Sequence, residues 1–204
     1  PNFHLLDTFL ARMELLDIPS LICFNKSDLD EDQSIYQEIE QIYRESGYPI
    51  IYTSAKKNQG IDELKQRLKG KCTTVAGPSG VGKSSLINLL QSNVQMETSD
   101  ISQKTARGRH TTRHSELIAL GENSFIMDTP GFTSLRMDEY EKEDISRGFR
   151  EIYMQEGSCR FAGCSHIHEP DCGVKEALCQ GKISKKRYDS YVMMYEECKE
   201  KRRY

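Results

Sequence analysis

One glycine-rich segment restricts the possible folds of this chain more than any other feature. Residues 77–84 read Gly-Pro-Ser-Gly-Val-Gly-Lys-Ser and match the pattern G-x-x-x-x-G-K-[ST]. They lie between an apolar run near Val75 and a stretch with helical apolar spacing over 83–90, which is the strand–loop–helix context that the pattern requires. The alternative, an ordinary glycine-rich turn, does not account for these flanking elements. The segment therefore predicts a phosphate-binding loop in an α/β fold.

The residue types in this loop suit the phosphates of a nucleoside triphosphate. Its glycines allow backbone N–H groups to turn toward phosphate oxygens, and the following helix adds the positive end of its dipole. The Lys83 ammonium can bind the β- and γ-phosphates, and the Ser84 hydroxyl can bind Mg²⁺. The expected phosphate-binding residues are Gly77, Ser79, Gly80, Val81, Gly82, Lys83, Ser84 and Ser85.

A second segment further along the chain suits the same metal and phosphate. Residues 126–131 read Ile-Met-Asp-Thr-Pro-Gly, so an acid follows an apolar strand. Asp128 can hold Mg²⁺ through water, and Gly131 leaves room for the γ-phosphate. The pattern D-x-x-G is common by itself, but behind a phosphate loop it is a strong indication of a nucleotide site.

Two segments nearer the N-terminus can select the base. Asn25-Lys26-Ser27-Asp28 follows the apolar run 21–24, and the Asp28 carboxylate can accept hydrogen bonds from guanine N1–H and from its exocyclic amine. Adenine lacks this donor pair and would leave the carboxylate unpaired. Lys26 can lie across the base, and Asn25 can tie this segment to the phosphate loop. A polar turn that caps the next helix is the alternative for these four residues alone.

The second base-selecting segment follows the apolar run 50–52. Ser54, Ala55 and Lys56 can offer a backbone N–H to guanine O6. Both base segments precede the phosphate loop, whereas in ordinary GTPases they follow it. One site can form from this order only if the chain is circularly permuted.

Apolar runs and helical spacings alternate through the first part of the chain. We expect helices over 3–16, 31–46, 61–68 and 83–90, and strands over 21–24, 50–52, near 75, and over 115–120 and 124–127. This alternation predicts a mostly parallel sheet with helices on both faces. From about residue 141 a helix-rich pattern surrounds a cysteine- and histidine-containing loop, so we expect a domain boundary near residue 140, between 1–140 and 141–204.

Composition excludes several classes of protein. The 204 residues hold 28 Lys+Arg and 31 Asp+Glu, a net charge of −3, which excludes a uniformly basic surface. The apolar runs are too short to span a membrane, and no secretory signal is present, so we expect a soluble cytoplasmic protein without a membrane partner. The first residue is Pro1, and residues upstream of it are expected to have been removed. The seven cysteines are odd in number and unevenly spaced, which favours a reduced compartment with a metal cluster.

The cysteines cluster in the polar segment 157–173. Cys159, Cys164, His166 and Cys172 provide three thiolates and one imidazole, a closed zinc set with no open position for catalysis. The expected zinc is structural, and His168 is an alternative ligand that spacing does not exclude. Cys179 and Cys198 lie on expected helices, where we predict ordinary buried residues.

Taken together, these segments resemble the circularly permuted GTPases and, within them, the RsgA (YjeQ) family. The resemblance covers nearly the whole chain and includes a switch sequence, Gly108-Arg-His-Thr-Thr112. Members of the family also carry an N-terminal OB-fold domain and a first strand of the sheet, which these residues lack. The resemblance favours His166 as the zinc ligand. It implies a GTPase that binds GTP or GDP with Mg²⁺ and acts in maturation of the small ribosomal subunit.

The segment 104–114 contains four Lys/Arg and no acid, and it lies where a GTPase places its first switch. We favour Thr112 over Thr111 as its Mg²⁺ ligand, because Thr112 immediately precedes Arg113. Phe132 occupies the position where many GTPases carry a water-orienting Gln, so intrinsic hydrolysis should be slow. The resemblance suggests that His110 acts on the attacking water; the alternative is a phosphate-contacting or exposed histidine.

The C-terminal stretch 182–204 holds eight Lys/Arg against four acids. These charges suit contact with an RNA backbone, while Tyr188, Tyr191 and Tyr195 are expected to form the buried face of a helix. The expected partners are the small subunit and its 16S rRNA, and we expect a monomer. Two rival hypotheses are a nucleotide-gated RNA-binding module with incidental turnover and a permuted GTPase of the large subunit.

Overall fold

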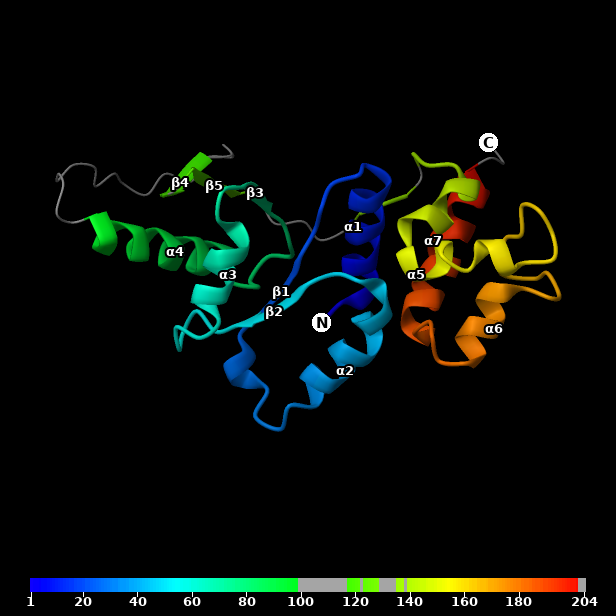
Figure 1. Cartoon of the computed structure of the whole chain (residues 1–204), viewed down its shortest axis with the longest axis horizontal. Helices are drawn as coiled ribbons and strands as arrows, with labels where there is room; N and C mark the ends of the chain where they lie inside the picture. The colour runs from blue at the N-terminus through cyan, green and yellow to red at the C-terminus, as the bar shows by residue number, and fades with distance from the viewer. Residues whose placement is uncertain (99–116, 122, 129–134, 138, 202–204) are drawn as a thin grey trace. The chain divides into compact units, whose positions relative to one another are not determined.

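The structure is a computed structural model that describes residues 1–98, 117–121, 123–128, 135–137 and 139–201. Figure 1 shows strands and helices that alternate through the first half of the chain, followed by a helical C-terminal part. The helices are α1 (Phe3–Leu15), α2 (Ser34–Tyr43), α3 (Ile61–Leu68), α4 (Lys83–Thr98), α5 (Arg150–Tyr153), α6 (Gly173–Cys179) and α7 (Lys185–Lys201). The strands are β1 (Ile22–Asn25), β2 (Ile50–Thr53), β3 (Cys72–Val75), β4 (Leu117–Gly121) and β5 (Ser124–Asp128).

The predicted elements are present, with small differences at their ends. The helix after the phosphate loop is longer than expected, because α4 continues to Thr98. The helix expected over 31–46 is shorter, since α2 ends at Tyr43 and a 3₁₀ turn, η2 (Arg44–Ser46), follows it. Gly47 then takes a φ of +69°, a left-handed conformation that glycine adopts without a steric penalty.

The strands pair in two groups within the described residues. β1 pairs with β2, and β5 lies between β3 and β4. β3 and β5 are parallel, with Val75 opposite Asp128 at their carboxyl ends, whereas β4 is antiparallel to β5. Because β3 and β5 end side by side, the loops that follow them begin at the same edge of the sheet. α4 packs against β4 and β5, and α3 packs against α4 (Figure 1).

The contacts divide the chain into two compact units, each built from separate stretches of sequence. The first unit comprises residues Pro1–Ile22, Asp32–Pro49 and Ser134–Tyr204, and the second comprises Cys23–Glu31 and Ile50–Thr133. The expected boundary near residue 140 lies within the first unit. The division into domains 1–140 and 141–204 stays a prediction.

The core of the first unit lies between α1, α7 and a 3₁₀ segment, η3 (Lys142–Gly148). Asn2 caps α1, since its Oδ1 accepts a hydrogen bond from the Leu5 N–H at 3.0 Å. Gly148 lies so close to α1 that a Cβ there would approach the Ala11 Cβ to 2.9 Å. The remaining core is apolar and contains Met137, Ile145, Phe149, Ile152, Cys172, Val174, Ala177, Ile183, Tyr191, Met194 and Cys198.

The helices α7 and α6 test two sequence predictions, the buried tyrosine face and the buried cysteines. Tyr191 is 1% exposed, and Tyr188 and Tyr195 pack against the same core, so the prediction that these tyrosines form a buried helix face is confirmed. Cys198 is buried as expected, but Cys179 is exposed. The buried side of α6 includes Val174 and Ala177, and Cys179 lies two positions further on, which points it to the other side.

Among the residues that the structure describes, no helix is both long and apolar enough to cross a membrane.

Candidate functional site

The glycine-rich loop connects β3 to α4 in the second unit. Gly80 and Gly82 have φ values of +80° and +93°, which favour glycine. Space also restricts Gly82, because a Cβ at this position would lie 2.3 Å from the Asn25 Nδ2. The loop therefore needs a residue without a side chain at the point where it meets the segment that follows β1.

Lys83 folds back over the loop that precedes it. Its Nζ donates hydrogen bonds to the carbonyl oxygens of Gly77 at 2.8 Å and of Pro78 at 2.9 Å. The ammonium thus lies against the backbone of the loop for which the sequence predicts phosphate binding, and it is available to a phosphate there.

The base-selecting segment is tied to the phosphate loop. The Asn25 amide donates from Nδ2 to the Val81 carbonyl at 3.0 Å, which is the tie that the sequence predicts. The Lys26 ammonium donates to the Gly80 carbonyl at 2.7 Å. Lys26 has a left-handed φ of +67°, which turns the chain from β1 into the 3₁₀ segment η1 (Ser27–Leu29). Segments more than fifty residues apart therefore form one structure.

The two base-selecting segments also contact each other. The Ser54 hydroxyl donates to Asp28 Oδ1 at 2.5 Å, and this hydrogen bond holds the pKa of the Asp28 carboxyl below its ordinary value. The Asn25 Oδ1 accepts from the Ala55 N–H at 3.2 Å and from the Thr53 hydroxyl at 3.3 Å. Ser54 therefore fixes the Asp28 side chain beside the second base segment, and a carboxylate is the form that can accept two hydrogen bonds from a guanine edge.

These contacts surround a pocket of about 680 Å³ within the second unit, a size typical of cofactor sites. Residues from the first base segment, from the second, and from α4 line it: Asn25, Lys26, Asp28, Leu29, Ala55, Lys56, Gly82, Ser85, Asn88 and Leu89. The structure thus brings together residues that the sequence assigns separately to base and phosphate.

Three of the lining residues were not predicted from the sequence. Leu29 directly follows Asp28, and Asn88 and Leu89 lie three and four positions after Ser85 on α4. Helical spacing from Ser85 is the signal that could have found the two α4 residues, since such positions share a helix face. Leu29 is 71% exposed, and its sequence position alone gave no signal.

For the other predicted site residues, the structure describes only the backbone or does not describe the residue. Asp128 ends β5 beside Val75, the last residue of β3, so its backbone lies at the edge where the phosphate loop begins. The Asp128 side chain is outside the described part of the structure. The same holds for Gly131, Phe132 and the switch segment 104–114 with His110, Thr111 and Thr112. Their roles stay predictions.

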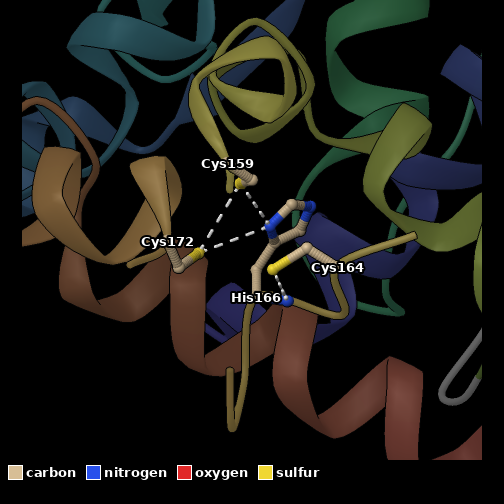
Figure 2. Close-up of side chains that lie close together, drawn as sticks. All are labelled: Cys159, Cys164, His166 and Cys172. Atoms are coloured by element: carbon tan, nitrogen blue, oxygen red, sulfur yellow. Dashed lines mark hydrogen bonds between the residues drawn. The ribbon is translucent and has the colours of Figure 1, made fainter. Parts of the chain in front are cut away.

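In the first unit, the four predicted zinc ligands lie together (Figure 2). Their ligand atoms are all within 4.8 Å of one another. The Cys159 and Cys172 sulfurs are 3.8 Å apart, and the His166 Nδ1 lies 3.4 Å and 3.5 Å from them. The exposed His168 is not part of this group, and its N–H donates to Glu169.

These distances fit a tetrahedral zinc ion. Zinc–sulfur bonds of about 2.3 Å place two ligand sulfurs about 3.8 Å apart, and a sulfur and an imidazole nitrogen about 3.5 Å apart. Burial raises the pKa of the Cys164 thiol to about 12, and the neighbouring Cys172 adds to this effect. A bound cation would favour the thiolate form of such a group. The donor set and its spacing therefore fit zinc, with Nδ1 as the histidine ligand atom.

The segments predicted to select the base precede the phosphate loop in the chain, in an α/β fold with parallel strands. This combination defines the circularly permuted GTPase fold. The family model of the RsgA GTPase matches residues 1–138. The chain belongs to this family of GTP-hydrolysing enzymes.

Relatives and solved structures agree with this assignment. The chain is 56% identical over all its 204 residues to "Small ribosomal subunit biogenesis GTPase RsgA" of Agathobacter rectalis and covers 67% of that protein. It is 44% identical to the protein of the same name from Alkaliphilus metalliredigens, covering 70% of it. The crystal structure of YjeQ from Thermotoga maritima is similar with a TM-score of 0.80 and 37% identity, over 97% of this chain and 66% of that one. The chain therefore spans about two thirds of the length of these relatives.

Proposed function

We propose that this protein hydrolyses GTP and acts in the cytoplasm as a switch in late maturation of the small ribosomal subunit. The observation that carries the proposal is the pocket in which Asp28, hydrogen-bonded to Ser54, lies in one structure with the phosphate loop. The names of the relatives support the ribosomal part.

In this proposal the base and the phosphates are bound by different segments of the pocket. Asp28 accepts from the guanine edge, and a backbone N–H of the segment Ser54–Lys56 reaches guanine O6. The N–H groups of the phosphate loop and the Lys83 ammonium bind the phosphates. In the structure Lys83 donates to two carbonyl groups of that loop, so it can exchange these bonds for phosphate oxygens.

Mg²⁺, when bound with the nucleotide, neutralises charge on the β- and γ-phosphates. Ser84, the first-turn residue after Lys83 on α4, is the proposed direct ligand, with Thr112 as the ligand from the switch. Asp128 is proposed to act through water, and its backbone at the end of β5 supports this role because β3 ends beside it. Gly131 would leave room for the γ-phosphate.

Contact with the small subunit is proposed to control hydrolysis. Phe132 cannot orient an attacking water, so a second group is needed, and His110 in the basic segment 104–114 is the proposed one. An anionic RNA would attract the four Lys/Arg of this segment and order it. Binding to 16S rRNA thus raises the rate, and hydrolysis releases the protein.

The C-terminal part is proposed to hold one structural zinc and to offer a second basic surface to RNA. Lys182 precedes α7, Lys185 and Lys186 begin it, and all three are exposed, whereas Arg187 is fully buried and does not belong to that surface. Lys185 and Lys186 form exposed ion pairs with Asp189 and Glu38, and in this proposal they exchange these partners for phosphate groups.

The proposal is tested by measuring GTP hydrolysis by the purified chain alone, with small subunits and with large subunits. We expect slow intrinsic turnover and strong stimulation by small subunits only. His110→Ala should abolish the stimulated rate and leave GTP binding intact. No stimulation, or equal stimulation by large subunits, would contradict the ribosomal part of the proposal.

A further inference from the structure

The imidazole of His166 has a second nitrogen that the zinc set does not use. Nδ1 faces the sulfurs of Cys159 and Cys172, and Nε2 lies 3.5 Å from the Glu156 Oε1. The His166 side chain is 2% exposed, so water does not readily provide a partner for Nε2. Glu156 is the carboxylate that the described structure places against this nitrogen.

The fold fixes His166 at its backbone. Its φ is +60°, a left-handed value that is uncommon for a residue with a side chain. Two tyrosines of α7 hold the peptide groups around it: the Tyr188 hydroxyl donates to the His166 carbonyl at 2.6 Å, and the Tyr191 hydroxyl donates to the Ser165 carbonyl at 2.7 Å. The backbone therefore determines where the ring lies but not which ring nitrogen carries the proton.

Glu156 and the first thiolate come from the same short turn. Glu156 begins the 3₁₀ segment η4 (Glu156–Ser158), and the Cys159 N–H donates to the Glu156 carbonyl at 3.1 Å. The position of the carboxylate relative to the Cys159 sulfur is thus set locally. Two other acids of this loop have different partners: Glu169 accepts hydrogen bonds from the Ser165 N–H and hydroxyl, and Asp171 pairs with Arg160.

A neutral imidazole offers a lone pair on one nitrogen and a proton on the other, and a metal needs the lone pair. A carboxylate at Nε2 stabilises the tautomer with its proton on Nε2, which leaves the Nδ1 lone pair directed at the sulfurs. We propose that Glu156 is a positioning residue that holds His166 in this tautomer and so presents Nδ1 to zinc. This inference rests on the proposed zinc site.

The test compares zinc affinity in four forms of the whole chain: the unchanged protein, Glu156→Ala, Glu156→Gln and Glu196→Ala. Glu196 is a matched control, since its side chain is 39% exposed against 35% for Glu156 and it pairs with Lys199 on α7. Each zinc-free protein is titrated with zinc in competition with a chromogenic chelator, and its helix content is followed by circular dichroism.

We expect Glu156→Ala to weaken zinc binding about 10–100-fold, as loss of such outer partners typically does. Glu156→Gln should recover most of the affinity, because its amide oxygen still accepts from Nε2–H. Glu196→Ala should bind zinc as the unchanged protein does. Long-range ¹H–¹⁵N spectra of the zinc-free protein should show the Nε2–H tautomer of His166, and a tautomer mixture in Glu156→Ala.

Each other outcome overturns the inference. If Glu156→Ala binds zinc as tightly as the control variant, the carboxylate does not position the ligand. If the alanine and glutamine variants lose zinc affinity equally, a hydrogen-bond acceptor at Nε2 is not sufficient to position His166, and the inference fails. If the unchanged protein binds no zinc, the zinc proposal itself fails, and the inference fails with it.

Discussion

Arg187 of α7 donates from Nη1 to Oδ1 of Asp7 of α1 at 2.8 Å, and neither side chain is exposed to solvent. Glu151 of α5 accepts two further bonds from the same guanidinium, at 2.7 and 3.2 Å, and the Tyr43 hydroxyl donates to Asp7 at 2.9 Å. Burial alone would lower the pKa of Arg187, but Glu151 and Asp7 raise it above its ordinary value. One buried cation thus joins three helices of the first unit.

Loss of one partner in this cluster should cost far more than loss of a surface ion pair. Asp7→Ala leaves Arg187 buried with one carboxylate fewer, so we expect the free energy of unfolding to fall by about 3–5 kcal/mol. Urea denaturation measures the change. Asp189→Ala is the control, since it removes an exposed pair with Lys185 and should cost less than about 1 kcal/mol. Equal losses in the two variants would contradict the structural role of the buried pair.

The cysteine and histidine cluster predicts a fixed metal content. Elemental analysis of the purified chain should find about one zinc per molecule, because the cluster provides one four-ligand set. A strong chelator should lower the Tm of the first unit, since the metal would cross-link the loop over 159–172 through its four ligands. A chain without metal that melts at the same temperature would refute the structural role of zinc.

Glu169 makes stability depend on pH in acid. Burial would raise its pKa, but hydrogen bonds from Ser165 and from the His168 N–H lower it to about 2. A pKa that is lower in the folded than in the unfolded chain means that this carboxylate stabilises the fold above about pH 4.5, and that its contribution disappears as the pH falls toward 2.

Glu169→Gln should therefore lower the free energy of unfolding by about 1 kcal/mol at pH 7, a small value because solvent partly screens the carboxylate. The difference from the unchanged protein should shrink as the pH is lowered from 5 to 3. Glu176→Gln on α6 keeps an acceptor for Gln180 and serves as the control. A difference between Glu169→Gln and the unchanged protein that is independent of pH would count against the assignment.

Elements whose formation depends on local pattern could be predicted from the sequence. Ile35, Ile39, Ile42 and Tyr43 recur at helical spacing, and the last three are buried on α2, whereas Ile35, in its first turn, is 39% exposed. Arg187 shows where such reasoning ends. Within a basic stretch it looks like a surface charge, and its burial depends on Asp7, which lies 180 residues away in the sequence. Local periodicity cannot predict an ion-pair partner that is so distant in the sequence.

The candidate site divides in the same way. The segments 25–28 and 77–84 can be predicted from the sequence because the residues of each binding motif are consecutive in the chain. Asn88 lines the pocket and Lys26 donates to the Gly80 carbonyl only because of how those segments pack, so neither feature can be predicted from the sequence. Glu156 was missed for the same reason, since its relation to His166 exists only when the loop is folded.

We propose that segments in permuted order form one guanine-specific pocket, and Asp28→Asn tests this proposal most directly. Dissociation constants for GDP and for xanthosine diphosphate would be measured for the unchanged chain, for Asp28→Asn, and for the control Asp30→Asn, a nearby acid that does not line the pocket. An asparagine at 28 can donate to the additional carbonyl of xanthine, whereas the carboxylate accepts from guanine.

We expect the unchanged chain and Asp30→Asn to prefer GDP, and Asp28→Asn to lose at least about tenfold in GDP affinity through its unpaired donors and to prefer the xanthine nucleotide. Retention of the GDP preference by Asp28→Asn would contradict the account.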